Sequence, residues 1–212
     1  MPSILITAGA TKNPLDAIRY ISAHSSGRTG VSLAEALSKK STVTLLGSTE
    51  ACLRAPNSLD TIEFSSTRDL MAKMQHWVSA NPNGVVVHAS AVGDYEADAS
   101  DKKIPSGKEE LILRLRPTPK IIDHILQWSP SVTLASFKAA PPGTSDEALI
   151  SIASKQRTRT GSAIVFANVI GRLQSRILIL QENQHQWFES RDDALQQLQL
   201  WAAAEAAKLD KD

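Results

Sequence analysis

The sequence has little cysteine, few aromatic residues and almost no net charge. Cys52 is the single cysteine, which excludes an intrachain disulfide framework and fits a reducing compartment. Lysine and arginine number 23 against 22 acidic residues, so no excess of basic charge argues for binding to nucleic acid or to an anionic membrane. No apolar run approaches the roughly 20 residues of a membrane helix, and the start lacks the basic region of a secretory leader. We therefore expect a cytoplasmic protein with no nucleic-acid partner and no membrane partner.

The sequence also lacks the common catalytic and phosphate-binding signatures. Neither GxGxxG nor the Walker pattern GxxxxGK[ST] occurs. No Ser-His-Asp, Cys-His or paired-carboxylate arrangement is evident, which disfavours hydrolases. No second histidine, cysteine or carboxylate lies at metal-ligand spacing around His88, which is interpreted as a core or edge histidine. The metal ligands, if there are any, are unknown from the residues alone.

Apolar runs of strand length alternate with helix-like segments along the chain. The runs are not interrupted by polar residues at every second position, which is typical of strands buried on both faces of a parallel sheet. We expect residues 1–212 to form one α/β domain, a doubly wound and mostly parallel sheet with ligands beyond the carboxyl ends of its strands. The predicted strands cover residues 4–6, 43–46, 85–88, 132–137, 164–166 and 177–180, and the predicted helices cover 30–40, 67–81, 121–129, 146–159 and 192–209.

The N-terminal stretch Ser3–Gly30 joins a strand to a helix through small residues. The apolar run Ile4–Ile6 is followed by a small-residue turn, and a second small cluster, Ser25–Gly27, precedes the helix that starts at Gly30. Free N–H groups and the helix dipole favour anions at such a place, and small residues let phosphate oxygens approach the backbone. The alternative is a turn that needs small residues only for packing.

Residues 94–120 interrupt the pattern and predict a flap. The segment is polar and rich in lysine until Leu111–Arg116, where leucines alternate with isoleucine and arginine. Alternation is typical of a half-exposed strand in a hairpin, and Pro117 and Pro119 end it. A protruding half-apolar hairpin commonly pairs with a second copy, so we expect a homodimer. A flap folded back on its own chain is the alternative.

Several single residues are candidates for chemistry, each with a plainer alternative. Asp94 follows the strand 85–88 and would accept a hydrogen bond from a ligand, or would stabilise a turn. Lys103, in the flap, would neutralise phosphate charge, or would be a solvated lysine. A basic cluster around Lys155 would face a triphosphate or solvent. Phe137 would stack on a base or pack in the core.

Five segments together resemble one family, phosphopantothenate–cysteine ligase, which is also the C-terminal half of a bifunctional coenzyme A biosynthesis flavoprotein. The strongest segment, ITAGAT…PLD…RYIS…SSGR.G over residues 6–30, is similar to the family's ITAGGT-x-x-P-[IL]-D-x-V-R-[YF]-I-[ST]-N-x-S-[ST]-G-x-x-G. ASAVGDY over 89–95 resembles AAAV[AS]D[YF], and Lys103-Ile104 resembles the start of the KI-K flap motif. Ser136-Phe137 and FAN over 166–168 resemble GF and [VC]AND.

This resemblance implies a Rossmann-like ligase that activates 4′-phosphopantothenate with CTP or ATP and joins the acyl-nucleotide to cysteine. Mg²⁺ would accompany the triphosphate, no flavin is expected, and the site would form across a homodimer with the flap. Lys103 and Asp94 would be catalytic, Asp94 also lining the substrate and base region. Ser90, Ala91 and Arg28 would contact substrate, and the nucleotide would be bound by Gly9, Ser25, Gly27, Gly30, Phe137, Asn168 and Lys155.

The sequence departs from the family's pattern at several positions, which keeps other functions open. Ala23 replaces an asparagine that contacts the acyl-nucleotide, and the loss of one such hydrogen bond costs on the order of 10²–10³ in rate. A catalytically impaired or re-tasked relative that still binds nucleotide is therefore the main alternative. A Rossmann-type oxidoreductase is disfavoured because no Tyr-x-x-x-Lys pair occurs. The other departures are Pro105 in the flap motif, Gln156 and Thr160 in a K-x-x-x-K motif, the loss of the glutamate of GFAAET in the segment Ser136–Pro141, and Val169 in AND.

Overall fold

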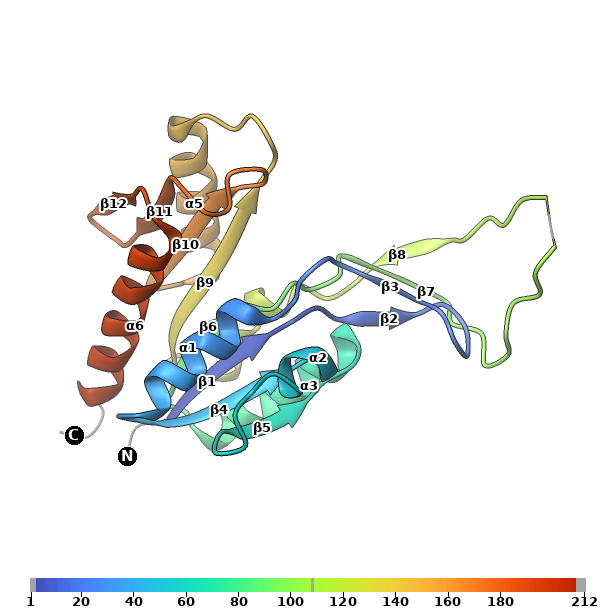
Figure 1. Ribbon diagram of the computed structural model, residues 1–212, viewed down its shortest axis with the longest axis horizontal. Coiled ribbons are helices and arrows are strands. Elements are labelled where there is room, and N and C mark those ends of the chain that lie inside the picture. Colours follow the sequence, from blue (N-terminus) through green and yellow to red (C-terminus); the bar gives the residue numbers. More distant parts are fainter. Residues whose placement is uncertain (1–2, 108, 209–212) are drawn as a thin grey trace.

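An eight-stranded sheet runs through the computed structural model, which describes residues 3–107 and 109–208 (Figure 1). Counted from one edge, the first six strands are parallel to their neighbours. Each of the last two strands is antiparallel to the strand before it. This arrangement confirms the predicted mostly parallel α/β fold. In spatial order the strands are β5 (Asp60–Glu63), β4 (Thr42–Gly47), β1 (Ser3–Ala8), β6 (Val85–His88), β9 (Thr133–Ala140), β10 (Ile164–Val169), β11 (Ile177–Leu180) and β12 (His185–Phe188).

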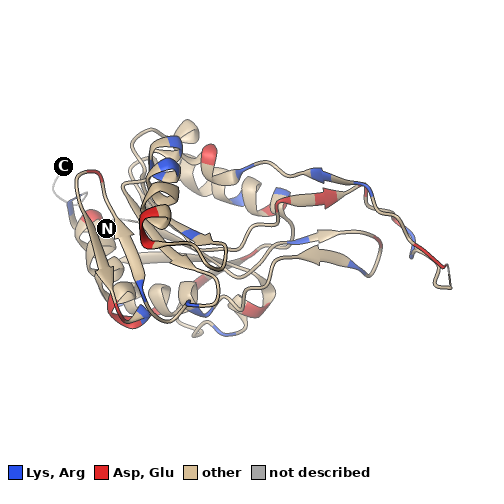
Figure 2. Ribbon diagram, turned by 90° about the horizontal axis from the view of Figure 1, so that it is seen from above, with Lys and Arg blue, Asp and Glu red and all other residues tan. Residues whose placement is uncertain are grey.

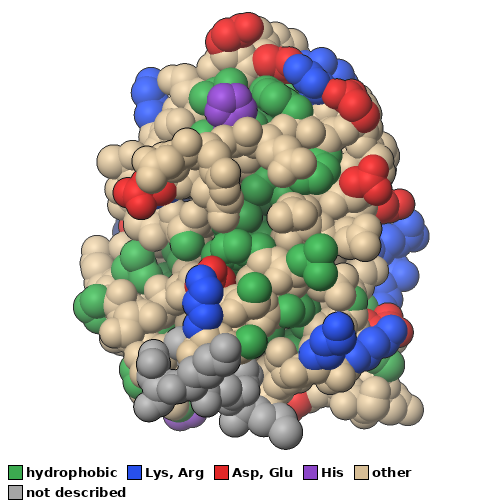
Figure 3. All heavy atoms as spheres, turned by 90° about the vertical axis from the view of Figure 1, so that its left-hand side faces the viewer, with side chains coloured by type: hydrophobic (Ala, Val, Ile, Leu, Met, Phe, Trp, Pro, Cys, Tyr) green, Lys and Arg blue, Asp and Glu red, His purple; other side chains and the backbone are tan. Residues whose placement is uncertain are grey.

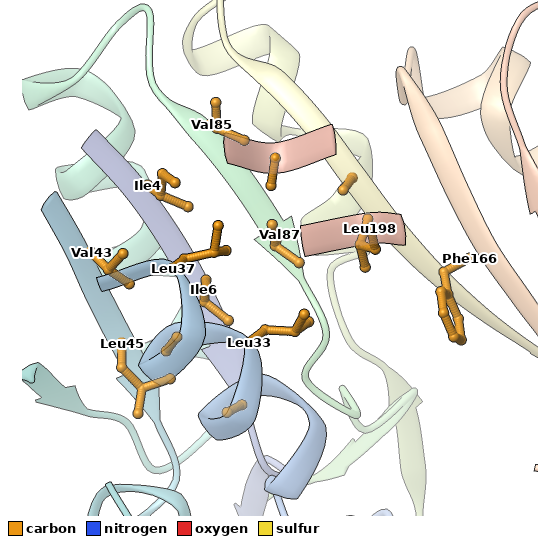
Figure 4. Packing of buried hydrophobic residues seen from close by; sticks show 14 of the residues in the cluster. Ile4, Ile6, Leu33, Leu37, Val43, Leu45, Val85, Val87, Phe166 and Leu198 are labelled. Atoms are coloured by element: carbon orange, nitrogen blue, oxygen red, sulfur yellow. The ribbon is translucent and has the colours of Figure 1, made fainter. Parts of the chain in front are cut away.

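Helices cover both faces of the sheet. On one face, α1 (Arg28–Ser38) and α6 (Arg191–Lys208) pack on apolar side chains from the central strands (Figure 4). On the other face lie α3 (Thr67–Ala80), the short η1 (Ile121–Asp123) and α4 (Ile125–Trp128), and α5 (Asp146–Thr160). A short α2 (Thr49–Cys52) follows β4. No helix in the described part of the chain is both long enough and apolar enough to cross a membrane.

The continuous apolar runs of the sequence follow from this two-sided cover. In β1, Ile4 and Ile6 join the cluster under α1, and Leu5 between them joins the cluster under α3. All three side chains are fully buried. A strand with both faces covered has no solvent-facing position, so it gains from apolar residues at every position.

Several elements differ from the sequence prediction. The strands β5 and β12 and the helix α2 were not predicted, because they are short and β5 is exposed along its length. The predicted helix 121–129 is divided into η1 and α4 around His124. The predicted strand 111–116 was wrong over 111–114, where the chain has no strand, and only its last two residues lie in β8 (Leu115–Pro117).

Two small antiparallel sheets form an arm that projects from the body (Figure 1). The first pairs β2 (Lys12–Pro14) with β3 (Tyr20–Ser22), and the second pairs β7 (Tyr95–Ala97) with β8. We use "the arm" for residues 12–22 and 95–117. Asn13 links the two sheets to the body, because its Nδ2 donates to the Tyr95 carbonyl at 2.8 Å and its Oδ1 accepts from the Thr67 N–H at 2.9 Å. Figure 2 shows both signs of charge along the arm.

Candidate functional site

Two neighbouring cavities open at the carboxyl ends of the parallel strands. The smaller one, of about 120 Å³, lies at the loop before α1, and the larger one, of about 290 Å³, lies beyond β6 and β9. Phe137 of β9 borders both cavities. In open α/β sheets, ligands bind at this edge where the strand order reverses, which here is between β1 and β6.

The loop before α1 leaves the helix N-terminus free for an anion. The residue before the helix, Gly27, has φ 75°, and no side chain caps the helix. The first turn of α1 also holds no acidic residue. A Cβ on Gly27 would lie 3.1 Å from the Gly9 nitrogen and 2.7 Å from the Ala51 Cβ, so a larger residue would not fit. Uncapped N–H groups at a helix start are anion-binding groups, which agrees with the predicted phosphate loop.

Arg191 adds a positive charge to the same small cavity. Its guanidinium donates to the Thr29 hydroxyl at 3.2 Å and to the Leu173 carbonyl at 3.1 Å, and lies 5.2 Å from the Phe166 ring centre. No carboxylate of residues 3–107 or 109–208 forms an ion pair with it, and burial lowers its pKa. Sequence reasoning missed this residue, because 162 positions separate it from Thr29.

A chain of hydrogen bonds fixes the tautomer of His88 at the larger cavity. The Ser90 N–H donates to the Thr7 hydroxyl at 3.0 Å, and that hydroxyl lies 2.9 Å from His88 Nδ1. All three groups are satisfied when the Thr7 hydroxyl donates to Nδ1, which leaves the proton on Nε2. Burial lowers the pKa of His88 to about 4, so the ring is neutral at physiological pH. His88 is buried, as predicted, but it also borders the cavity as a neutral donor.

Ser90 contributes an unused polar group to the larger cavity. Its hydroxyl oxygen is buried and has no hydrogen-bond partner among the described residues. Buried polar atoms are almost always paired, so an unpaired hydroxyl that borders a cavity indicates a ligand group.

A buried neutral network lies under Phe137. Gln156 Nε2 donates to the Ser136 hydroxyl at 3.0 Å and to the Phe137 carbonyl at 3.1 Å. The Ser162 hydroxyl lies 2.9 Å from that of Ser136 and 2.7 Å from that of Thr160. The two positions at which the resemblance implies lysines therefore hold neutral side chains that are satisfied within the protein.

Basic residues at other positions border the larger cavity instead. Arg159 at the end of α5 faces it and is paired with Asp123, while Arg157 pairs with Glu182 on the far side of the helix. Lys155 is exposed and borders neither cavity. The basic residues that form a cluster in the sequence therefore do not gather at one site in the structure. The other cations at this cavity are Lys120 and Lys138.

Most of the predicted site residues come together at the two cavities. Asp94 borders the larger one, is exposed, and pairs with Lys120 rather than stabilising a turn. Ala91 borders neither, but its N–H donates to the Gly9 carbonyl at 2.8 Å, so both residues shape the floor between β1 and β6. The predicted residues that border a cavity are Ser25, Gly27, Arg28, Gly30, Ser90, Asp94 and Phe137.

Besides Lys155, two more predicted residues lie away from both cavities, Asn168 and Lys103. Asn168 is buried on β10, beside Ala139 of β9. Lys103 is exposed on the arm and borders neither cavity of its own chain.

Comparisons with known proteins agree with this architecture. The coenzyme A biosynthesis bifunctional protein CoaBC of Thermococcus kodakarensis is 39% identical over 169 residues, and these cover 79% of this chain and 41% of that protein. The DNA/pantothenate metabolism flavoprotein of Streptococcus pneumoniae superposes with a TM-score of 0.86 at 26% identity, over 96% of this chain and 99% of that one. A Cab2 mutant in complex with phosphopantothenate-cysteine has the same fold, with a TM-score of 0.78 at 17% identity, over 100% of this chain and 89% of that one.

The resemblance drawn from the motifs is confirmed by a family match over nearly all of the chain. The family described as DNA/pantothenate metabolism flavoprotein C-terminal domain matches residues 2–208. That range includes the glycine loop, both cavities and the arm. The chain therefore belongs to the DNA/pantothenate metabolism flavoprotein C-terminal domain family.

Proposed function

We propose that this chain is the ligase domain that joins 4′-phosphopantothenate to cysteine, using CTP or ATP, in coenzyme A biosynthesis. The observation that carries the proposal is the pair of adjoining cavities at Phe137. One has an uncapped helix N-terminus and Arg191, and the other has the unpaired Ser90 hydroxyl. The cavity at the helix N-terminus suits phosphates, and the cavity at Ser90 suits a polar organic group. The family, and a relative with the fold that is named for a complex with phosphopantothenate-cysteine, support the same function.

The reaction needs positioning and charge stabilisation rather than a protein nucleophile. A carboxylate oxygen of phosphopantothenate attacks the α-phosphorus of the nucleotide, and pyrophosphate leaves. The cysteine amine then attacks the acyl carbon, the nucleoside monophosphate leaves, and the amine loses a proton to give the amide. The α1 N-terminus, Arg28 and Arg191 would hold the phosphates, where negative charge moves during both steps. His88 and Ser90 would donate hydrogen bonds to the organic part.

Mg²⁺ would accompany the triphosphate. Among the residues that the structure describes, no group of three or more His, Cys, Asp or Glu could hold a metal ion. Mg²⁺ commonly binds through phosphate oxygens and water with one or two carboxylates, so a donor set limited to Asp94 fits an ion carried by the nucleotide. Bound there, Mg²⁺ would neutralise phosphate charge.

We also propose that the site is completed by Lys103 from a second copy. Lys103 is exposed on the arm and borders neither cavity of its own chain, so a partner's arm is the natural source of this charge. Most large apolar side chains of the arm are exposed, whereas at the opposite end of the molecule apolar groups are interspersed with polar ones (Figure 3). Exposed apolar surface of this kind marks an interface. The exposed apolar residues of the arm are Ile18, Tyr20, Tyr95, Leu111, Ile112, Leu113 and Leu115.

Pyrophosphate release tests this proposal directly. The protein is supplied with Mg²⁺, phosphopantothenate and CTP or ATP, with and without cysteine, and its mass in solution is measured. Turnover that needs cysteine is expected, from a dimer, and the better nucleotide identifies the cosubstrate. Lys103→Ala should reduce the rate by about 100-fold, whereas Lys102→Ala, at the adjacent exposed position, should not. A folded dimer that releases no pyrophosphate under any of these conditions would exclude the ligase.

A second candidate, a relative that binds nucleotide without ligation, is favoured by one observation. Gln156 and Thr160 replace the lysines of the family's pattern and are engaged in a satisfied buried network. Tight nucleotide binding by calorimetry with no pyrophosphate release would favour this function.

A further inference from the structure

The turn between β2 and β3 contains a buried carboxylate, and both of its oxygens accept hydrogen bonds. Asp16 Oδ1 accepts from the Ile18 N–H at 2.9 Å and from the Arg19 N–H at 2.8 Å. Its Oδ2 accepts from Arg19 Nη1 at 3.0 Å and from the Ile104 N–H, 88 residues away, at 3.0 Å. Asp16 is only 5% exposed. The Ile104 N–H is the largest of the causes that hold its pKa below the ordinary value. We call Asp16, Arg19 and Ile104 the clamp.

The clamp fixes the peptide that joins Lys103 to Ile104. The Ile104 N–H is held by Asp16, and the Ile104 carbonyl accepts from Arg19 Nη1 at 3.2 Å. A second tether lies four residues earlier, where the Ser100 N–H donates to the Leu15 carbonyl at 3.0 Å. The backbone of Lys103 is therefore held between two fixed points, while its side chain stays exposed.

Little else holds this part of the arm. Residues 98–114, apart from Lys108, contain no strand, and every described residue from 98 to 107 is exposed except the half-buried Ile104. Apolar packing contributes little to such a segment, so hydrogen bonds to a buried charge account for most of its order. A carboxylate is needed for this arrangement, because an amide can present only one acceptor oxygen and cannot pair with a guanidinium.

We propose that Asp16 and Arg19 are positioning residues that hold the Lys103 backbone, so that its ammonium reaches the reacting phosphate at a fixed place. The proposal rests on the function proposed above for Lys103. Mispositioning of a catalytic group by about 1 Å is enough to cost on the order of 10²-fold in rate.

The kinetic test is Asp16→Asn, and Asp101→Asn is the control, because Asp101 is an exposed aspartate on the segment that carries Lys103. Asp16→Asn should lower kcat by at least about tenfold and leave the nucleotide Kd within about twofold, because Asp16 lies outside both cavities. Asp101→Asn should change neither. In a Lys103→Ala background Asp16→Asn should cause no further loss, since both changes remove the same contribution. An equal loss in both backgrounds would mean that Asp16 acts through some other part of the fold, and would overturn the proposal.

Hydrogen exchange of the Ile104 amide tests the clamp without any activity. Asp16→Asn should speed this exchange by at least about tenfold, and Asp101→Asn should leave it unchanged. Arg19→Gln, which keeps the turn's own N–H bonds to Asp16 Oδ1, serves if Asp16→Asn does not fold, and it should speed the exchange as well. Unchanged exchange in an active, folded Asp16→Asn protein would refute the clamp. Absence of turnover in the unaltered protein would instead refute the proposed ligase, and the exchange result would still stand.

Discussion

Gly30→Ala is the change that most directly tests how the glycine loop is built. Gly30 is the third residue of α1, where the helix crosses the end of β1. A Cβ there would lie 2.6 Å from the Ala8 Cβ and 2.8 Å from the Thr7 carbonyl oxygen. Carbon contacts are most favourable at about 3.5–4.0 Å, so the start of α1 would have to move by about 1 Å.

Two opposing effects set the size of the change in stability. Overpacking of this kind costs about 1–3 kcal/mol. Alanine also forms helix better than glycine by about 1 kcal/mol, which offsets part of that cost. Because the obstructing atoms include backbone of β1, which cannot rotate away, the clash should prevail. We expect a net loss of up to about 2 kcal/mol in the free energy of unfolding.

Urea unfolding and calorimetric nucleotide binding measure the two consequences of Gly30→Ala. The midpoint should fall, and nucleotide affinity should fall more steeply, since the N–H groups that face the phosphates move with the helix. Ser32→Ala, at an exposed position of the same helix, is the control and should keep both properties. Equal midpoints and equal affinities for the two variants would refute the argument that contact between α1 and β1 requires glycine.

Three further predictions concern pH, activity and a helix cap. Because the unfolded chain protonates His88 near pH 6.5 and the folded chain only near pH 4, wild-type stability should fall between these values as pH decreases. This loss of stability is on the order of 3 kcal/mol. His88→Gln should therefore reduce the fall of the urea midpoint between these pH values, and an unchanged fall would contradict the burial assigned to His88. Ala23→Asn should raise pyrophosphate release by on the order of 10- to 100-fold, and a rate no higher than that of the unaltered protein would show that the asparagine is dispensable here. Ser145→Ala should cost about 1 kcal/mol in urea unfolding, because its hydroxyl caps α5 by accepting from a backbone N–H at 3.2 Å; the exposed mid-helix control Ser151→Ala should cost less, and equal losses would argue against the cap.

The sequence by itself determined the layered fold and the glycine loop. Strands such as β1 and β6 have no solvent-facing side, so their apolar runs identified them without any knowledge of neighbours. The glycine loop was also readable locally, because a cluster of small residues followed by a helix is a property of adjacent residues, although the helix begins at Arg28 and not at the predicted Gly30. The exposed β5 and the strand predicted over 111–114 could not be read in this way, since a strand exists only where a partner offers hydrogen bonds.

Only the tertiary structure decided which polar groups meet at the site. Arg191 comes from the start of the last helix, and Ile104 reaches Asp16 across 88 residues, so no local pattern connects either pair of partners. The tautomer of His88 depends on Thr7 of another strand. Strand and helix formation depend on neighbours a few residues apart, which the sequence displays. The charges and hydrogen bonds of the site depend on distances between remote segments, and these are fixed only when the sheet brings the carboxyl ends of its strands together.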